Sequence, residues 1–344
     1  MTRMTQRRRA LAAVAAGLAL AATAVVASTG EDDAGRQQGQ TKRSDSMSLY
    51  VVPVTGGEPR ELSTAPETEG DETHAKATDH THDPGTAGHK HDDQPEEEET
   101  QIDTPSFSPD GRRFAYTKVS CEYCQSRLWV APARDPGRAR EVARVRNPFQ
   151  ASWSPDGRRL AVVQPTLGIS VVDVRTGASR LVVPAGDRSV ESPAWSPTDD
   201  RILFIEQRSA TNWDIYAADA RTKRRTRVTS TAAQETGPTW SPDGRRIAFA
   251  RQDETGAWRI LAMSARGGPA TPLTPRGVSA VEPAFSPDGR TIAATGQQGD
   301  DSFIWVISLG GGKPRRVTTK DLFASQPEWS PDGERLLFVA RALE

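Results

Sequence analysis

The stretch Pro238-Thr-Trp-Ser-Pro-Asp-Gly-Arg-Arg-Ile-Ala-Phe-Ala250 recurs in six versions along this chain of 344 residues. The serine at its centre marks each copy, and successive marker serines are 46, 42, 45, 45 and 44 residues apart. The marker serines are Ser108, Ser154, Ser196, Ser241, Ser286 and Ser330. A fixed period of about 40–50 residues is typical of solenoid and propeller proteins.

Each copy predicts a β-hairpin. An aromatic residue such as Trp240 lies in its first strand, and Ser-Pro-Asp-Gly suits a tight turn. The apolar run 247–250 is typical of a buried second strand. The third copy has Thr198-Asp-Asp200 in place of Asp-Gly. We expect its turn to persist in altered form, because aspartate tolerates left-handed backbone better than most residues.

A second pair of short strands follows each hairpin, as at 304–306 and 316–318. Four short strands per repeat predict a propeller blade. The sixth copy ends two strands before a complete blade, and residues 48–63 have the pattern of the missing pair. We therefore predict an all-β, six-bladed β-propeller in residues 105–344, whose last blade is shared by N-terminal and C-terminal strands. Closure of this kind removes exposed sheet edges.

The repeated Trp-Ser-Pro-Asp-Gly phrase, followed by Ile-Ala-Phe, resembles the WD40-like repeat of the TolB β-propeller family. The resemblance covers residues 48–63 and 105–340 and implies this fold. TolB itself carries an additional α/β domain ahead of its propeller, for which the residues before 48 leave no room. A rigid ring with variable loops suits a binding scaffold, so we predict a non-catalytic scaffold at the cell envelope.

Residues 1–30 have the layout of a secretory signal peptide: arginines up to Arg9 precede an uncharged, alanine-rich run. An uncleaved membrane anchor is the alternative, because about 18 apolar residues approach the length that spans a bilayer. Export is expected in both cases, with membrane contact only through this segment. Residues 31–47 are polar and are expected to form a flexible tether.

Charge is distributed unevenly, with +4 over residues 1–30, −13 over 31–104 and +8 over 105–344. The acidic segment 64–104 has almost no apolar residues, which predicts disorder. It contains all five histidines: His74, His80, His82, His89 and His91. Short His-rich tracts bind divalent metals weakly. A solvated acidic linker is the alternative interpretation.

Cys121 and Cys124 are the only cysteines, in a loop expected beside the His-rich segment. Export to an oxidising compartment favours a disulfide between them. Together with histidines the pair could instead hold zinc or copper. A free or redox-active pair is the third interpretation. We predict no cofactor other than a weakly bound divalent metal of this kind.

A polar or acidic residue precedes the aromatic of each first strand by three to five positions. These residues are Asp103, Gln150, Glu191, Glu235, Glu282 and Gln326. In a propeller such positions surround the mouth of the central channel, where carboxylates attract a cation or a basic peptide. The alternative is that they are polar only because the channel is solvated. We predict an envelope protein or peptide as the partner of this face, and a monomeric chain.

Two function classes are disfavoured. The aromatics recur at one structural position, and arginine pairs such as Arg245-Arg246 are expected to form a solvated surface, so nucleic-acid binding is not predicted. Residues 105–344 contain no histidine, and no Gly-x-Ser-x-Gly motif is present. The chain is therefore not expected to be an enzyme, with a metal-dependent hydrolase or lyase in the channel as the alternative.

Overall fold

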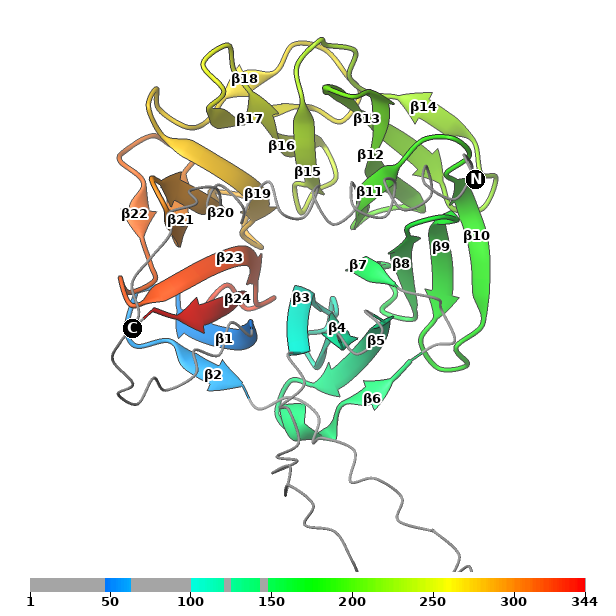
Figure 1. Cartoon of the computed structure of the whole chain (residues 1–344), viewed down its shortest axis with the longest axis horizontal. Helices are drawn as coiled ribbons and strands as arrows, with labels where there is room; N and C mark the ends of the chain where they lie inside the picture. Colours follow the sequence, from blue (N-terminus) through cyan, green and yellow to red (C-terminus); the bar gives the residue numbers. More distant parts are fainter. Residues whose placement is uncertain (1–46, 63–99, 121–124, 143–147, 344) are drawn as a thin grey trace, which may run out of the picture.

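The computed structural model describes residues 47–62, 100–120, 125–142 and 148–343. These residues form six four-stranded sheets arranged around one central axis (Figure 1). The described residues contain no α-helix, and one 3-10 turn, Pro136–Arg138, lies between two strands of the first blade. The predicted six-bladed β-propeller is confirmed.

Within each blade, the four strands are ordered from the innermost strand beside the axis to the outermost strand at the rim. Blades 1 and 2 comprise β3 (Thr100–Phe107), β4 (Arg113–Ser120), β5 (Gln125–Pro132), β6 (Arg140–Glu141), β7 (Phe149–Trp153), β8 (Arg159–Gln164), β9 (Gly168–Asp173) and β10 (Ser179–Pro184). Blades 3 and 4 comprise β11 (Val190–Trp195), β12 (Arg201–Ser209), β13 (Asn212–Asp219), β14 (Arg225–Arg227), β15 (Glu235–Trp240), β16 (Arg246–Gln252), β17 (Trp258–Ser264) and β18 (Thr271–Pro272). Blades 5 and 6 comprise β19 (Ser279–Phe285), β20 (Thr291–Gln298), β21 (Asp301–Ser308), β22 (Arg315–Arg316), β23 (Leu322–Trp329), β24 (Arg335–Ala342), β1 (Ser48–Pro53) and β2 (Arg60–Leu62).

The last blade combines both ends of the described chain. Its strand order is β2-β1-β24-β23, and β1 pairs with β24 from Ser48 opposite Ala340 to Pro53 opposite Arg335. The ring of Tyr50 stacks on Phe338 with a centroid distance of 5.9 Å. The predicted closure by N-terminal and C-terminal strands is therefore confirmed.

One predicted boundary is wrong. β3 begins at Thr100, which pairs with Ser120, so the last five residues of the segment 64–104 belong to the sheet. The reason is that β4 extends to Ser120 and offers backbone partners to a polar strand, while Ile102 is buried between blades. Residues 63–99 lie outside the described part of the chain.

The marker serine organises the turn between the first two strands of a blade. Ser241 Oγ lies 2.6 Å from Asp243 Oδ1 and accepts the backbone N–H of Arg246 at 2.9 Å. The bond from Ser241 holds the pKa of the Asp243 carboxyl below its usual value. In the third copy Ser196 Oγ lies 3.3 Å from Thr198 Oγ1, while the Ser196 N–H still donates to the Arg201 carbonyl at 2.7 Å. This turn persists in altered form, as expected.

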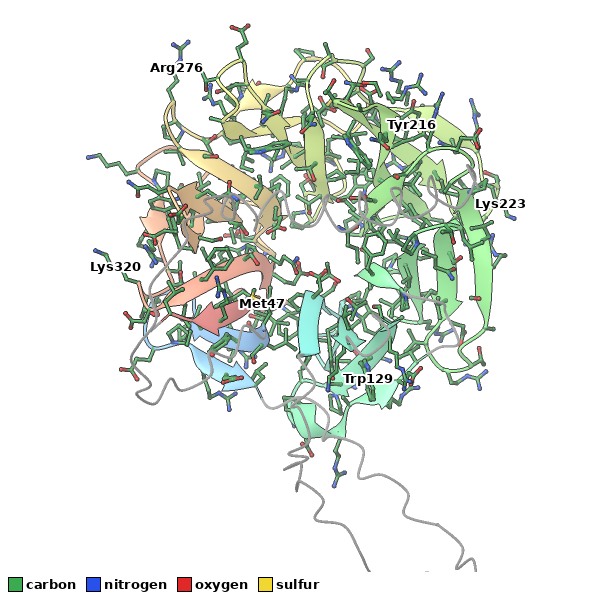
Figure 2. The ribbon with its side chains drawn as sticks, in the orientation of Figure 1. Met47, Trp129, Tyr216, Lys223, Arg276 and Lys320 are labelled. Atoms are coloured by element: carbon green, nitrogen blue, oxygen red, sulfur yellow. The ribbon has the colours of Figure 1, made fainter. Side chains whose placement is uncertain are left out.

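Six separate clusters of buried hydrophobic residues fill the spaces between neighbouring blades (Figure 2). The repeated aromatic belongs to these interfaces. Trp240 Nε1, for example, donates to the Ala194 carbonyl of the preceding blade at 2.9 Å. The Arg201 guanidinium of that blade lies 4.8 Å from the centre of the Trp240 ring. Blade 4 is thus held by blade 3 through packing, a hydrogen bond and a cation–π contact.

The two arginines of a pair differ in their contacts, which adds detail to the expected solvated arginine surface. Arg245 and Arg246 are both exposed, and the Arg246 guanidinium lies 5.6 Å from the ring centre of Phe285 in the next blade. Arg246 also donates to the Gly289 carbonyl at 3.1 Å. Arg113 makes the same two contacts with the blade that follows it. The second arginine of the pair therefore links blades.

Candidate binding site around the central axis

The innermost strands of the six blades surround the axis (Figure 1). In most blades the residues five, four and two positions before the marker serine are partly exposed. The residues six and three positions before it are buried between blades, with few exceptions. The first set therefore lines the axis, because the sheet faces are covered by neighbouring blades.

The residue four positions before the marker serine has a left-handed backbone in every blade, with φ between +49° and +57°. These residues are Thr104, Gln150, Ser192, Gly237, Glu282 and Gln326. Five of them are not glycine, so the conformation is strained and must be held by its surroundings. Each lies where the pairing of the innermost strand shifts register, as in a β-bulge. Bulges of this kind re-aim side chains and are frequent beside functional sites.

Three of these left-handed residues connect their blade with the next one through a side-chain hydrogen bond. Gln326 Oε1 accepts the backbone N–H of Thr104 at 2.6 Å. Gln150 Oε1 accepts that of Ser192 at 2.6 Å, and Glu282 Oε2 accepts that of Gln326 at 3.0 Å. The side chain thus reaches the equivalent residue of the next blade. We refer to these three contacts as the blade links.

A chain of polar side chains extends from the blade links between blades 5, 6 and 1. Gln326 Nε2 donates to Asp103 Oδ1, and Thr295 Oγ1 donates to Glu282 Oε2 at 2.7 Å. Burial raises the pKa of Asp103 above its usual value. Burial, and then the negative charge of Asp103, raise the pKa of Glu282. The two carboxyls therefore hold protons more tightly than exposed acids do.

Two more carboxyls line the axis. Burial raises the pKa of Glu191 from 4.5 to about 7, and that of Glu328 from 4.5 to about 8. Glu328 is absent from the predicted set because it directly precedes the aromatic Trp329, whereas the predicted residues precede their aromatics by three to five positions. The sequence does distinguish Glu328, because the equivalent residues of the other copies are the small residues serine, alanine or threonine. Asp103, Glu191, Glu282 and Glu328 are called the axial carboxyls below.

The six residues predicted for the channel mouth do not occupy one structural position. Gln150, Glu282 and Gln326 have the left-handed backbone, whereas Asp103 and Glu191 come one residue earlier in their repeats. These five side chains are partly exposed along the axis. Counting residues back from the aromatic does not reveal the bulge. The bulge changes the sheet face on which the preceding residues lie.

Glu235 is a correction to the predicted set. It comes two residues before the left-handed position and is buried between blades, where Arg251 donates to its Oε1 from Nε at 2.9 Å and Nη2 at 2.7 Å. Thr231 also donates to this oxygen, at 3.1 Å. The carboxylate of Glu235 is therefore used within blade 4 and does not face the axis.

The predicted metal and disulfide residues lie outside the described part of the chain. This holds for all five histidines and for Cys121 and Cys124, so both interpretations stay predictions. Within the described ranges, no three His, Cys, Asp or Glu side chains stand together as a metal would require. None of the described helices is long and apolar enough to cross a membrane, and the predicted leader, 1–30, precedes the described residues.

Comparison with known proteins agrees with this architecture. The family model described as the TolB beta propeller domain matches residues 135–283. The structure of a putative TolB from Agrobacterium tumefaciens superposes with a TM-score of 0.65 and 19% identity, over 87% of this chain and 99% of that one. TolB from Acinetobacter baumannii gives a TM-score of 0.51 and 19% identity, over 71% of this chain and 55% of that one.

A curated relative is a longer protein that matches this chain only in part. The uncharacterized peptidase YuxL of Bacillus subtilis is 27% identical over 33% of this chain, and the match spans only 20% of the peptidase. The peptidase activity in that protein's name is not carried over with this match. The repeated phrase of this chain, its six blades and the domain match over residues 135–283 show a TolB-like β-propeller.

Proposed function

We propose that this propeller is an exported, non-catalytic scaffold that binds a basic segment of an envelope protein or peptide at its central axis. The observation that carries the proposal is the set of axial carboxyls, which come from blades 1, 3, 5 and 6 and line one axis. Lysine and arginine side chains form charge-assisted hydrogen bonds with such carboxylates. A basic segment entering the axis would therefore find acceptors on several sides.

A basic side chain suits this arrangement better than a metal ion. The axial carboxyls stand on separate blades, and the described residues hold no cluster of three acidic, His or Cys side chains within reach of one ion. An ammonium or guanidinium group needs only one or two acceptors at a time. Export and the envelope location follow from the predicted leader in residues 1–30.

The rest of the ring supports a scaffold. Gln150, Glu282 and Gln326 form the blade links, which hold the backbone around the axis, and Glu282 is itself one of the axial carboxyls. A rigid site loses little conformational entropy when a ligand binds, which favours affinity. Contacts that fix the backbone beside the axial carboxyls are what a binding scaffold requires.

A titration with short peptides tests the proposal. The exported chain is titrated calorimetrically with pentalysine, and with pentaglutamate as the charge control. We expect saturable binding of pentalysine that strengthens from pH 6 to pH 8.5. The reason is that burial raises the pKa of Glu191 to about 7 and that of Glu328 to about 8, so both carboxyls ionise over this range. Binding should release protons, seen as a dependence of the heat on buffer ionisation enthalpy.

Variants locate the binding. Glu191→Gln combined with Glu328→Gln should weaken pentalysine binding about tenfold or more, since each removes a charged acceptor. Glu254→Gln is the matched control, because Glu254 is exposed in the turn after β16. Equal weakening by both sets of substitutions would mean that the peptide binds to general negative charge, and the proposed site would be abandoned.

A further inference from the structure

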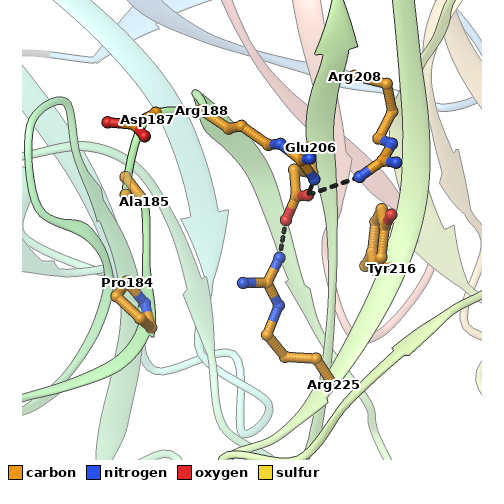
Figure 3. Close-up of a pocket in the computed structure, with 9 residues that line it drawn as sticks. Pro184, Ala185, Asp187, Arg188, Glu206, Arg208, Tyr216 and Arg225 are labelled. Carbon is orange, nitrogen blue, oxygen red and sulfur yellow. Dashed lines mark hydrogen bonds and ion pairs between the residues drawn. The ribbon is translucent and has the colours of Figure 1, made fainter.

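A pocket of about 530 Å³ opens at the border of blades 2 and 3 (Figure 3). One wall is the end of β10 with Pro184 and the connection from β10 to β11 with Ala185 and Arg188. The other wall is the face of blade 3, with Arg208, Tyr216 and Arg225. None of the axial carboxyls lines this pocket, so it is independent of the binding site proposed at the axis.

A buried carboxylate, Glu206, lies on the floor of this pocket with a side chain only 4% exposed. Arg188 Nη1 lies 2.8 Å from Glu206 Oε1, and Arg225 Nη2 contacts Oε2. Arg208 Nη1 stands 3.6 Å from Oε1. Three guanidinium groups thus converge on one carboxylate (Figure 3).

The neighbouring acids do not restore neutrality. Asp214 is buried beside the pocket and is paired with its own arginine, Arg227, at 2.6 Å. Arg208 Nε is 3.9 Å from Asp214, beyond hydrogen-bond range. Asp187 lies at the rim and points away from the guanidinium groups (Figure 3). The donors that face the opening therefore carry excess positive charge.

Arg225 is held in place by two aromatic rings. The Arg225 guanidinium lies 5.5 Å from the ring centre of Phe204 and 5.6 Å from that of Tyr216. Burial, and then the positive charge of Arg188, lower the pKa of the Arg225 guanidinium. Arg188 and Arg208 keep side-chain exposures of 47% and 32%, so their remaining donors can be reached from outside.

We propose that this arginine pocket binds a small ligand through an oxyanion group, either a carboxylate or a phosphate. Guanidinium groups bind both kinds of oxyanion through paired hydrogen bonds. Glu206 positions the three arginines and leaves donors of Arg188 and Arg208 for the ligand. The volume falls within the range of about 300–1,000 Å³ that is usual for small-molecule sites.

Calorimetric titration of the full chain with inorganic phosphate and with citrate tests this site, with ionic strength held constant by sodium chloride. We expect saturable binding of at least one anion. Stronger binding of phosphate would identify a phosphorylated ligand, and stronger binding of citrate a polycarboxylate. If neither anion binds better than chloride, the site does not exist as proposed.

Substitutions in opposite directions separate a real site from general charge. Arg188→Gln should weaken anion binding about tenfold or more, because it removes a charged donor. Glu206→Gln should strengthen it, because the arginines lose their internal competitor. Arg208→Gln serves as a second weakening variant if Glu206→Gln does not fold.

The matched control is Arg276→Gln, since Arg276 projects from the outer edge of the ring far from the pocket (Figure 2). It should leave anion binding unchanged, and so should the Glu191→Gln and Glu328→Gln pair. Equal loss in Arg188→Gln and Arg276→Gln would overturn the proposal. Because the axial variants act only on pentalysine binding, failure of this site and failure of the axial site can be told apart.

Discussion

The turn at the marker serine and the left-handed position four residues before it lie in the same strand-turn unit. The residues of the turn are nearly the same in every copy, whereas the residue at the left-handed position differs from copy to copy. Five of the six turns repeat one set of contacts, from the serine hydroxyl to the aspartate and to the residue that begins the second strand. The left-handed position keeps its backbone but carries threonine, glutamine, serine, glycine or glutamate.

The difference shows which contacts a repeat can specify. A turn closes within one copy, so its sequence is sufficient to form it. The left-handed position faces the axis, and in three of the six blades its side chain contacts a residue of another copy. Variation at this position therefore creates individual blade links, and the axial carboxyl Glu282, while the left-handed backbone is kept. Substitutions in the two regions test this difference.

The largest effect should come from the aromatic that joins the two regions. Trp240→Ala removes a buried side chain and the hydrogen bond to Ala194, and should lower the free energy of unfolding by about 3–5 kcal/mol. Trp240→Phe should cost less, because Phe285 occupies the equivalent position of blade 5. Urea denaturation measures both. A loss below about 1 kcal/mol for the alanine variant would contradict the role of this residue in blade packing.

The axial carboxyls should make stability fall as the pH rises. Between pH 4.5 and about 7 for Glu191, or about 8 for Glu328, the unfolded chain releases a proton that the folded chain keeps. The free energy of unfolding therefore decreases across this window. Glu328→Gln should be more stable than the parent at pH 9 by about 1–3 kcal/mol and equal to it below pH about 4.5. Thermal unfolding across the pH range checks the sign, and a variant that is less stable at pH 9 would refute it.

The blade links should contribute a smaller amount each. Gln150→Ala leaves the backbone N–H of Ser192 without its acceptor and should cost about 1–2 kcal/mol. Gln326→Ala should cost more, because Gln326 also donates to Asp103. Urea denaturation and hydrogen exchange at Ser192 and Thr104 measure the effect. If the two amides exchange as slowly in the variants as in the parent, the links are not needed to hold the strained backbone.

The smallest effect should distinguish the two arginines of one pair. Arg246→Ala loses the contacts with Phe285 and Gly289 and should cost about 0.5–1 kcal/mol, as expected for an exposed cation–π pair. Arg245→Ala is the internal control and should be neutral within about 0.5 kcal/mol, because Arg245 is exposed. Equal costs would mean that the contact with the next blade adds nothing.

Much of the fold could be predicted from the sequence, because each repeat contains its own turn signals and strand pattern. The step of about 45 residues, the Ser-Pro-Asp-Gly turn and the strands at 48–63 were sufficient for six blades and their closure. The start of β3 at Thr100 was not predictable in the same way. Its residues are polar, and they form a strand only because β4 lies beside them.

The candidate site was predicted in part. The axial region could be located from the position of the repeat, but the count of residues before the aromatic did not reveal the bulge. Glu235 and Glu328 show the consequence: the first is turned into the space between blades, and the second is turned toward the axis. The arginine pocket had no local signal, because Arg188, Glu206 and Arg225 come from three separate segments.

The amino-acid sequence alone determined the number of blades, the turn in each and the closure of the ring, since these depend on contacts within about ten residues or on a strict repeat. The tertiary structure alone decided which carboxyls face the axis, which arginines link blades and where three guanidiniums meet. Those outcomes depend on backbone bulges and on contacts between different copies, and such contacts exist only once the ring has formed.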